Sequence, residues 1–97
     1  MFARVTITQT KVDKTDEAVK VSKESVFPAA KSQKGFVGAQ LLTDKTGKGI
    51  FITFWDTEED AIANEKSGYY QQQLAKFKDL FAGPPGHEGY DVAFKTD

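Results

Sequence analysis

The segment from Gly35 to Ala61 constrains the fold of this chain more than any other part of it. It reads GFVGAQLLTDKTGKGIFITFWDTEEDA. Two runs rich in β-branched and aromatic residues, 36–43 and 49–55, flank a polar turn that contains glycine, which predicts a β-hairpin. The second run ends in the only tryptophan, Trp55, and a Thr-x-x-Asp pattern at residues 57–60 then predicts the capped start of a helix.

Apolar residues occupy both faces of this predicted hairpin. Alternation assigns Val37, Ala39, Leu41 and Phe51 to one face, and Phe36, Leu42, Ile50, Ile52 and Phe54 to the other. A sheet with one face in water would carry polar residues at every second position. We therefore expect something to cover each face.

Residues 2–10 alternate as a strand does. One face carries Ala3, Val5 and Ile7, and the other carries Phe2, Arg4, Thr6 and Thr8. Residues 88–95 alternate again and predict a last strand, with Tyr90, Val92 and Phe94 on one side.

Two helical regions are predicted between the strands. The first runs from about residue 13 to 33, with a kink or break at Pro28, because proline lacks an N–H and crowds the carbonyl four residues earlier. The second begins near residue 57, breaks at Ser67-Gly68 and resumes as far as the Pro/Gly loop at 83–86. The residues spaced for burial are Val19, Val26 and Ala30, then Tyr70, Leu74, Phe77 and Phe81.

The resulting βαββαβ order predicts an α+β, ferredoxin-like fold with helices on one face of a four-stranded antiparallel sheet. A chain of 97 residues is long enough for one modest core, so we expect a single domain over residues 1–97. The simplest cover for the second apolar face is another copy of the chain. We therefore expect a homodimer in which two sheets face each other as an α+β barrel.

Composition narrows the partners and the location. The net charge is −1 with acidic and basic residues interspersed, so neither a nucleic acid nor a membrane is an expected partner. The absence of cysteine excludes disulfides and thiol chemistry. The first residues lack the pattern of a targeting signal, and no apolar run is long enough to span a bilayer, so we expect a cytoplasmic protein.

The chain resembles the antibiotic-biosynthesis monooxygenase-like family of the dimeric α+β barrel superfamily. The resemblance covers nearly the whole chain and rests on the order and spacing of several segments. These are Pro28-Ala29-Ala30, Lys34-Gly35-Phe36-Val37-Gly38, Thr53-Phe54-Trp55 before an acidic helix start, Ser67-Gly68-Tyr69-Tyr70 and Glu88-Gly89-Tyr90-Asp91-Val92.

The resemblance implies a homodimer with a small-molecule pocket between the sheet and the helices of each protomer. Some family members oxygenate phenolic or quinol-type substrates without metal or flavin, with the deprotonated substrate supplying electrons to dioxygen. Some oxygenating members carry an asparagine four residues before the tryptophan, where this chain has Phe51. The relatives that degrade haem need an axial histidine in the second helical region, and residues 69–74 contain none, so haem degradation is not expected. We expect no cofactor and no metal site.

Trp55 and Arg4 are the candidate catalytic residues. The indole N–H of Trp55 could donate to a substrate oxygen, although a large aromatic residue at a strand end is more often part of the core. Arg4 is the only arginine, and its planar fork would suit a phenolate or carboxylate if its strand face lines the pocket. If that face is exposed, Arg4 is only a solvated side chain or part of an interface ion pair.

Four further residues are candidates for substrate binding. They are Tyr70, Asn64, His87 and Thr6. Packing is the commoner role of a tyrosine on an apolar stripe. A single histidine in a Pro/Gly loop is more often solvated, and no second histidine supports a metal site.

Two other functional classes compete with a cofactor-independent monooxygenase. An RNA-recognition module shares the βαββαβ order, but the residues KGIFITF at 48–54 fit its third-strand signature poorly and the net charge is slightly acidic. A non-catalytic ligand-binding or structural dimer of the same fold is the alternative that the sequence leaves open.

Overall fold

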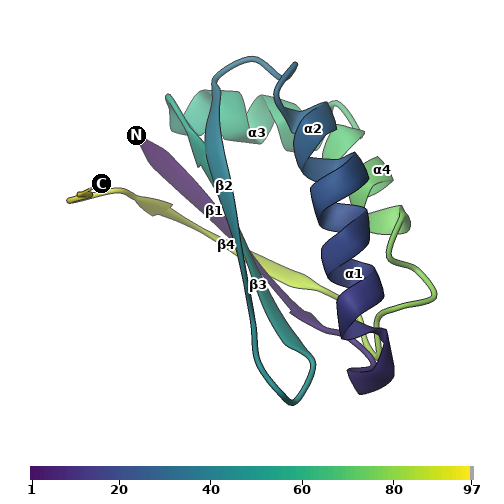
Figure 1. Ribbon diagram of the computed structural model, residues 1–97. Helices are drawn as coiled ribbons and strands as arrows, with labels where there is room; N and C mark the ends of the chain where they lie inside the picture. The colour runs from purple at the N-terminus through teal and green to yellow at the C-terminus, as the bar shows by residue number, and fades with distance from the viewer. Residues whose placement is uncertain (97) are drawn as a thin grey trace.

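A four-stranded antiparallel sheet forms one layer of the molecule, and the helices pack on one of its faces (Figure 1). The computed structural model describes residues 1–96, and Asp97, the last residue of the predicted domain, lies outside the described residues. The strands are β1 (Phe2–Gln9), β2 (Phe36–Thr43), β3 (Lys48–Trp55) and β4 (Gly86–Asp91), in the spatial order β2-β3-β1-β4. This arrangement confirms the predicted α+β, ferredoxin-like fold.

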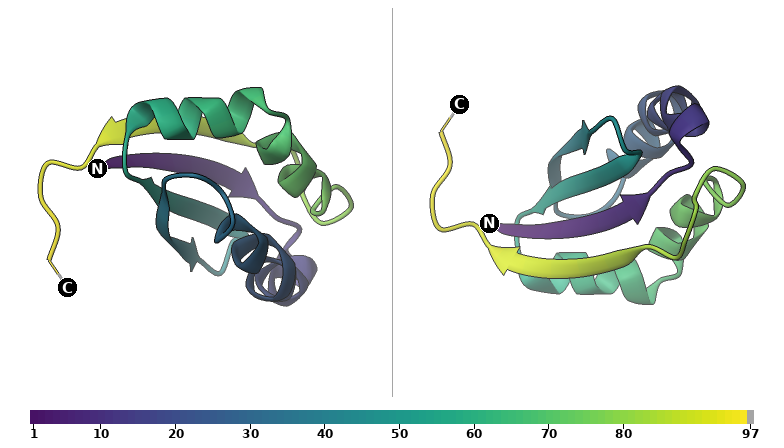
Figure 2. Two further views of the ribbon diagram at one scale, coloured as in Figure 1. Left: turned by 90° about the horizontal axis from the view of Figure 1, so that it is seen from above. Right: turned by 90° about the horizontal axis from the view of Figure 1, so that it is seen from below.

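The helices form two groups that lie over different parts of the sheet. The first group is η1 (Val12–Lys14), α1 (Thr15–Val21), η2 (Ser22–Val26) and α2 (Phe27–Ala30), and the second is α3 (Glu58–Lys66) and α4 (Tyr69–Ala75). Figure 2 shows α3 and α4 running along β1 and β4, while α1 and α2 lie beside β2 and β3. Within the described residues, no helix has the length and apolar character needed to cross a membrane.

Pro28 widens the first helix and does not break it. The backbone N–H of Phe27 donates to the Ser22 carbonyl, which makes η2 a π-helical turn just before the proline. Wider turns keep residues four apart on one face, so Ala18, Ser22 and Ala30 are buried. Val19, which we predicted to be buried, is 37% exposed, whereas its neighbour Ala18 is 5% exposed and takes the buried position.

The second helical region breaks where predicted, but α4 is shorter than expected. Gly68 adopts a left-handed conformation with φ of 87°, which ends α3 and redirects the chain into α4. Tyr70 and Phe77 are buried as predicted, although Phe77 lies in a turn that follows α4. Leu80, which the periodicity did not select, is also buried.

The register of β1 on β3 shows which residues share a face of the sheet, and their burial shows which face the helices cover. Arg4 lies opposite Thr53 and Thr6 opposite Phe51, and both β1 residues are buried. The helices therefore cover the face of β1 that carries its polar residues, Arg4, Thr6 and Thr8. The opposite face, here called the open face, carries Val5, Ile7, Gln40, Leu42, Ile50, Ile52, Phe54, Glu88 and Tyr90.

A β-bulge in β2 moves Phe36 to the helix-covered face, which corrects the predicted assignment. The register of β2 on β3 shifts between Phe36 and Gly38, so the extra residue Val37 is left 43% exposed. Phe36 then packs edge-on against Trp55, with ring centres 5.7 Å apart. Gly35 has a φ of 81°, and a side chain there would collide with Asp60 at the start of α3.

The last strand begins and ends earlier than the alternation predicts. β4 spans Gly86–Asp91 and not residues 88–95, because its partner β1 begins at Phe2. One further backbone bond, from the Val92 N–H to the Met1 carbonyl at 3.0 Å, follows the strand. Beyond it the chain leads away from the sheet (Figure 2), and Phe94 is 82% exposed.

Candidate functional site

A cavity lies between the helix-covered face of the sheet and the helices. Its sheet wall consists of Arg4, Thr6, Phe51, Thr53 and Trp55, and its helical wall of Val26, Phe27, Ala30, Tyr69, Tyr70, Gln73, Leu74 and Phe77. The enclosed volume that water can occupy is about 50 Å³, enough for a few waters. With the solvent-filled mouth included, the empty space is about 550 Å³. Most of the lining is aromatic or aliphatic, as is typical of small-molecule sites.

Arg4 places a buried positive charge in this apolar cavity. Its guanidinium lies 4.1 Å from the ring centre of Tyr70 and 5.1 Å from that of Trp55, and the residue is only 5% exposed. Nη1 makes one long hydrogen bond of 3.4 Å to the Ala61 carbonyl, and Nε has no partner among residues 1–96. Burial lowers the pKa of Arg4, although an arginine stays protonated throughout the ordinary pH range.

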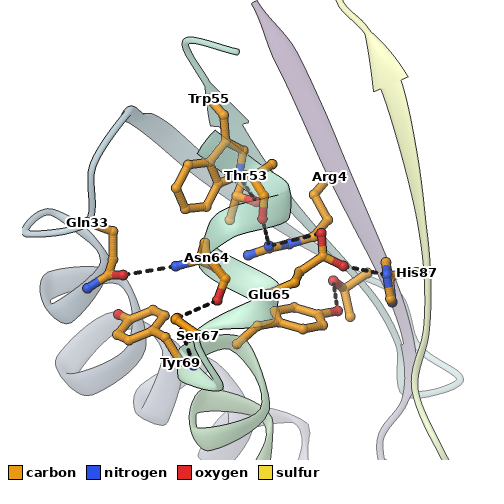
Figure 3. A network of polar contacts seen from close by, with 12 residues as sticks. Arg4, Gln33, Thr53, Trp55, Asn64, Glu65, Ser67, Tyr69 and His87 are labelled. Atoms are coloured by element: carbon orange, nitrogen blue, oxygen red, sulfur yellow. Dashed lines mark hydrogen bonds and ion pairs between the residues drawn. The ribbon is translucent and has the colours of Figure 1, made fainter. Parts of the chain in front are cut away.

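Glu65 connects this buried cation to the surface. One carboxylate oxygen lies 3.7 Å from Arg4 Nη1, and the other lies 2.7 Å from Nε2 of His87 on β4 (Figure 3). The 3.7 Å separation is an ion pair without a tight hydrogen bond, so it compensates the Arg4 charge only in part. Glu65 thus holds Arg4 in place and leaves it able to attract a second anion.

Trp55 is a core residue whose indole N–H is already engaged. It is 1% exposed, and its Nε1 donates to Oγ1 of Thr53 over 2.9 Å. Because the Thr53 hydroxyl accepts from the indole, its own hydrogen remains available for donation. Thr53 lines the cavity, so the donor that sequence reasoning assigned to Trp55 is replaced in this geometry by the Thr53 hydroxyl.

Thr6 and Tyr70 join the two walls of the cavity. Their hydroxyl oxygens lie 2.6 Å apart and share a hydrogen bond, and the Tyr70 ring packs edge-on against the His87 ring at 5.3 Å. Burial raises the pKa of Tyr70, an effect that Thr6 and Arg4 only partly offset. The phenol is therefore neutral at ordinary pH and acts as a hydrogen-bond donor or acceptor.

Tyr69 and Gln73 bring two further polar groups to the helical wall. Both residues are half-buried and line the cavity, and neither the Tyr69 hydroxyl nor Gln73 Oε1 has a hydrogen-bond partner within the described chain. Burial raises the pKa of Tyr69 as well, so its hydroxyl is neutral. Figure 3 shows Tyr69 extending toward the side of Gln33, whereas Arg4 enters from β1.

Four of the six predicted site residues line the cavity, namely Arg4, Trp55, Thr6 and Tyr70. Asn64 and His87 do not. The Asn64 side chain is buried and donates to Gln33 Oε1 at 3.0 Å, and His87 reaches the cavity only through its contacts with Glu65 and Tyr70.

Sequence reasoning missed Thr53, Glu65 and Gln73. Each shares a face with a residue that was identified or buried, at a spacing that could have revealed it: Thr53 is two strand positions before Trp55, Glu65 one turn after Ala61, and Gln73 one turn after Tyr69. Among residues 1–96, no cluster of three histidine or carboxylate side chains could hold a metal ion.

Comparisons with known proteins agree with the fold. The family model for antibiotic biosynthesis monooxygenase matches residues 1–76, which include β1 to β3 and the helices from η1 to α4, whereas β4 follows the matched range. None of the curated proteins gives a significant match.

Several solved structures share the architecture at low sequence identity. A monooxygenase from the gene ActVA-Orf6 of Streptomyces coelicolor, solved with the ligand nanaomycin D, is 16% identical with a TM-score of 0.80, over 98% of this chain and 89% of that one. A candidate antibiotic biosynthesis monooxygenase from Nitrosomonas europaea is 21% identical with a TM-score of 0.76, over 97% and 100%. Another from Deinococcus radiodurans is 11% identical with a TM-score of 0.78, over 100% and 97%.

Proposed function

The chain belongs to the antibiotic biosynthesis monooxygenase family, and from this premise we propose that it binds a phenolic or quinol-type aromatic molecule and oxygenates it with dioxygen. The proposed reaction uses neither metal nor flavin. One oxygen atom replaces hydrogen at a ring carbon and the other leaves as water. The ring C–H and phenolic O–H hydrogens are lost, so a phenol becomes a quinone and the substrate itself supplies the four electrons that reduce dioxygen.

The observation that carries the proposal is that the buried positive charge of Arg4 is only partly paired. A buried guanidinium with a long hydrogen bond, a loose ion pair and an unpartnered Nε–H is an incompletely compensated charge. In a site of low dielectric constant such a cation attracts an anion strongly. It favours the phenolate form of a bound phenol, and the phenolate is the electron-rich form that reacts with dioxygen.

The remaining lining supports the same chemistry. The Thr53 hydroxyl supplies a donor on the same wall as the cation, and the aromatic and aliphatic side chains that line the cavity give an aromatic ligand surfaces to pack on. The apolar walls limit access of water, which otherwise competes for the phenolate. The relative that was solved with nanaomycin D is a monooxygenase of this fold that holds a small organic ligand.

The phenylalanine at position 51, where some oxygenating relatives have an asparagine, favours a second candidate function: a ligand-binding dimer without catalysis. Phe51 is buried and packs edge-on against Phe77 and Phe27, where it supplies no polar group to the cavity. In this alternative the cavity binds the same class of aromatic molecule, and Arg4 serves affinity alone.

We also propose that the open face joins two copies of the chain as an α+β barrel. The open face is apolar, with Ile7 38%, Leu42 49% and Tyr90 51% exposed in a single copy. Covering such a face with its own symmetry mate removes these side chains from water. A single domain over residues 1–97 and a cytoplasmic location remain predictions.

Oxygen uptake with a panel of naphthols, quinols and hydroxylated polycyclic aromatics tests the proposed reaction. We expect uptake by the wild-type protein, a loss of about 100-fold in Arg4→Met, and partial recovery in Arg4→Lys, which restores the charge without the planar fork. Trp55→Phe should reduce the rate less. Lys20→Met, a substitution at an exposed position of α1, is the control.

Two results would separate the candidates. If the protein binds the aromatic compounds through Arg4 but consumes no oxygen, the non-catalytic alternative is correct. Uptake that persists undiminished in both Arg4→Met and Trp55→Phe would refute the proposed mechanism.

A further inference from the structure

Two polar groups on the helical wall of the cavity have no role in the site as described so far. They are the Tyr69 hydroxyl and Gln73 Oε1, which are fully shielded from solvent and have no partner within residues 1–96. Native proteins rarely leave such groups unpaired, so each one calls for an explanation, such as a functional role or a bound molecule. Both side chains line the same cavity as Arg4.

The two residues lie four positions apart on α4, so their side chains leave the same face of the helix. Residues four apart on a helix are neighbours on one face, with about 5–6 Å between their Cβ atoms. The two groups nevertheless form no hydrogen bond with each other. Both groups therefore remain free to bond to a ligand in the cavity that their side chains line.

The chemistry of the pair restricts which group of a ligand can bond to both. Gln73 Oε1 only accepts, and Tyr69, kept neutral by the burial that raises its pKa, donates through its O–H. A hydroxyl group both donates and accepts, so it satisfies both partners. A ketone or ether oxygen only accepts and would leave Gln73 Oε1 unpaired, and a hydrogen atom would leave both unpaired.

The two walls present their polar groups at different places. Arg4 and Thr53 belong to the sheet wall, and Tyr69 and Gln73 belong to the helical wall, where Figure 3 shows Tyr69 extending away from β1. Aromatic and aliphatic side chains make up most of the remaining lining. A ligand that satisfies both places needs two oxygen functions separated by an apolar ring system.

We propose that Tyr69 and Gln73 form a specificity site for a second hydroxyl group of the aromatic ligand, remote from the oxygen that Arg4 binds. This inference rests on the proposed binding of a phenolic molecule and adds which phenols are selected. The site distinguishes a hydroxyl from a methoxy or keto oxygen at the remote position. It therefore favours the dihydroxy form of a ligand over its singly oxygenated or oxidised forms.

Calorimetric titration under nitrogen, with 1-naphthol, a set of isomeric naphthalenediols and their monomethyl ethers, tests this selectivity. We expect at least one diol to bind the wild-type protein roughly tenfold more tightly than its own monomethyl ether, because the ether leaves Gln73 Oε1 buried without a donor. In Tyr69→Phe and Gln73→Met this preference should fall to less than about twofold. The affinity for 1-naphthol should change little in either variant.

Gln72→Met is the matched control, because Gln72 lies on the same helix with its side chain exposed. It should retain the full preference for the diol. Thermal unfolding of the unliganded variants gives a second readout: removing an unpaired buried hydroxyl costs no hydrogen bond, so Tyr69→Phe should melt at the same or a higher temperature than the wild type. A lower melting temperature would show that the Tyr69 hydroxyl has a structural partner, and would overturn the proposal.

The two levels of inference fail in different ways. If the wild-type protein binds neither 1-naphthol nor any diol, the proposed function itself fails. If 1-naphthol binds through Arg4 but no diol is preferred over its ether, water satisfies Tyr69 and Gln73 and only the specificity site is refuted. A diol preference that survives Tyr69→Phe and Gln73→Met refutes it equally.

Discussion

The two faces of the sheet reverse the usual distribution of polar and apolar residues. The face beneath the helices carries Arg4, Thr6 and Thr53 among aromatic rings, whereas the open face is dominated by aliphatic and aromatic side chains. In an isolated globular domain the covered face would be apolar and the exposed face polar.

This reversal is the one we expect if, as proposed above, each face serves a different partner. The polar groups beneath the helices surround a cavity and remain incompletely paired, as a small-molecule site requires. The open face is apolar and carries few charged groups, as the buried cores of protein–protein interfaces do. The two central strands, β1 and β3, each contribute to both faces by alternation.

The largest effect that separates the two faces is expected from truncating Trp55. Trp55→Ala should lower the free energy of unfolding by about 3–5 kcal/mol, because the side chain is 1% exposed and its loss leaves a large cavity. Leu42→Ala on the open face, where Leu42 is 49% exposed, should cost a monomer less than about 1 kcal/mol. Urea unfolding followed by circular dichroism, at a concentration where the chain is monomeric, measures both. Equal losses would show that the two faces are equally buried.

A charge on the open face should break the dimer and leave the protomer folded. Ile7→Lys places a positive charge at the interface once from each copy, at a cost of about 3 kcal/mol, so self-association should weaken by roughly 100-fold. Val12→Lys, at a position 64% exposed on η1, is the control and should leave association unchanged. Sedimentation over a range of micromolar concentrations measures the dissociation constant. A wild-type monomer throughout that range would contradict the dimer.

The smallest effect concerns the hydrogen bond between the walls of the cavity. Tyr70→Phe should cost about 1 kcal/mol at pH 8, because Thr6 loses its partner. Burial raises the pKa of Tyr70 above its ordinary value of 10.0, so its stabilising contribution is complete below pH 10 and is lost as the pH rises through the folded-state pKa. The difference in unfolding free energy between wild type and variant should therefore shrink above pH 10. A difference that stays constant from pH 8 to pH 11 would contradict this assignment.

The sequence predicted the elements well where a local signal marks them. The break at Gly68, the hairpin around residues 44–47 and the strand pattern of residues 2–9 each follow from residue chemistry within a short window. The errors arose where the outcome depended on a partner that lies far away in the sequence. Residues 92–95 alternate like a strand, but β1 offers them no partner beyond Met1.

The candidate site was predictable only in part for the same reason. Arg4 and Trp55 stood out because each is the only residue of its kind. Glu65, Thr53 and Gln73 are ordinary residue types at ordinary positions, and only their placement against Arg4 or the cavity gives them a role. Asn64 was selected for proximity along the chain, and its side chain instead faces Gln33.

By itself the sequence determined the order of the elements, the α+β fold class and the presence of more apolar surface than one layer of helices can cover. Such properties depend on periodicity and on residues that interrupt it, which act over a few neighbours. The tertiary structure decided which face of β1 lies beneath the helices, and hence that Arg4 is a buried cation and not a solvated one. That choice depends on the packing of groups as distant as Thr6 and Tyr70, 64 positions apart, whose contact no local pattern encodes.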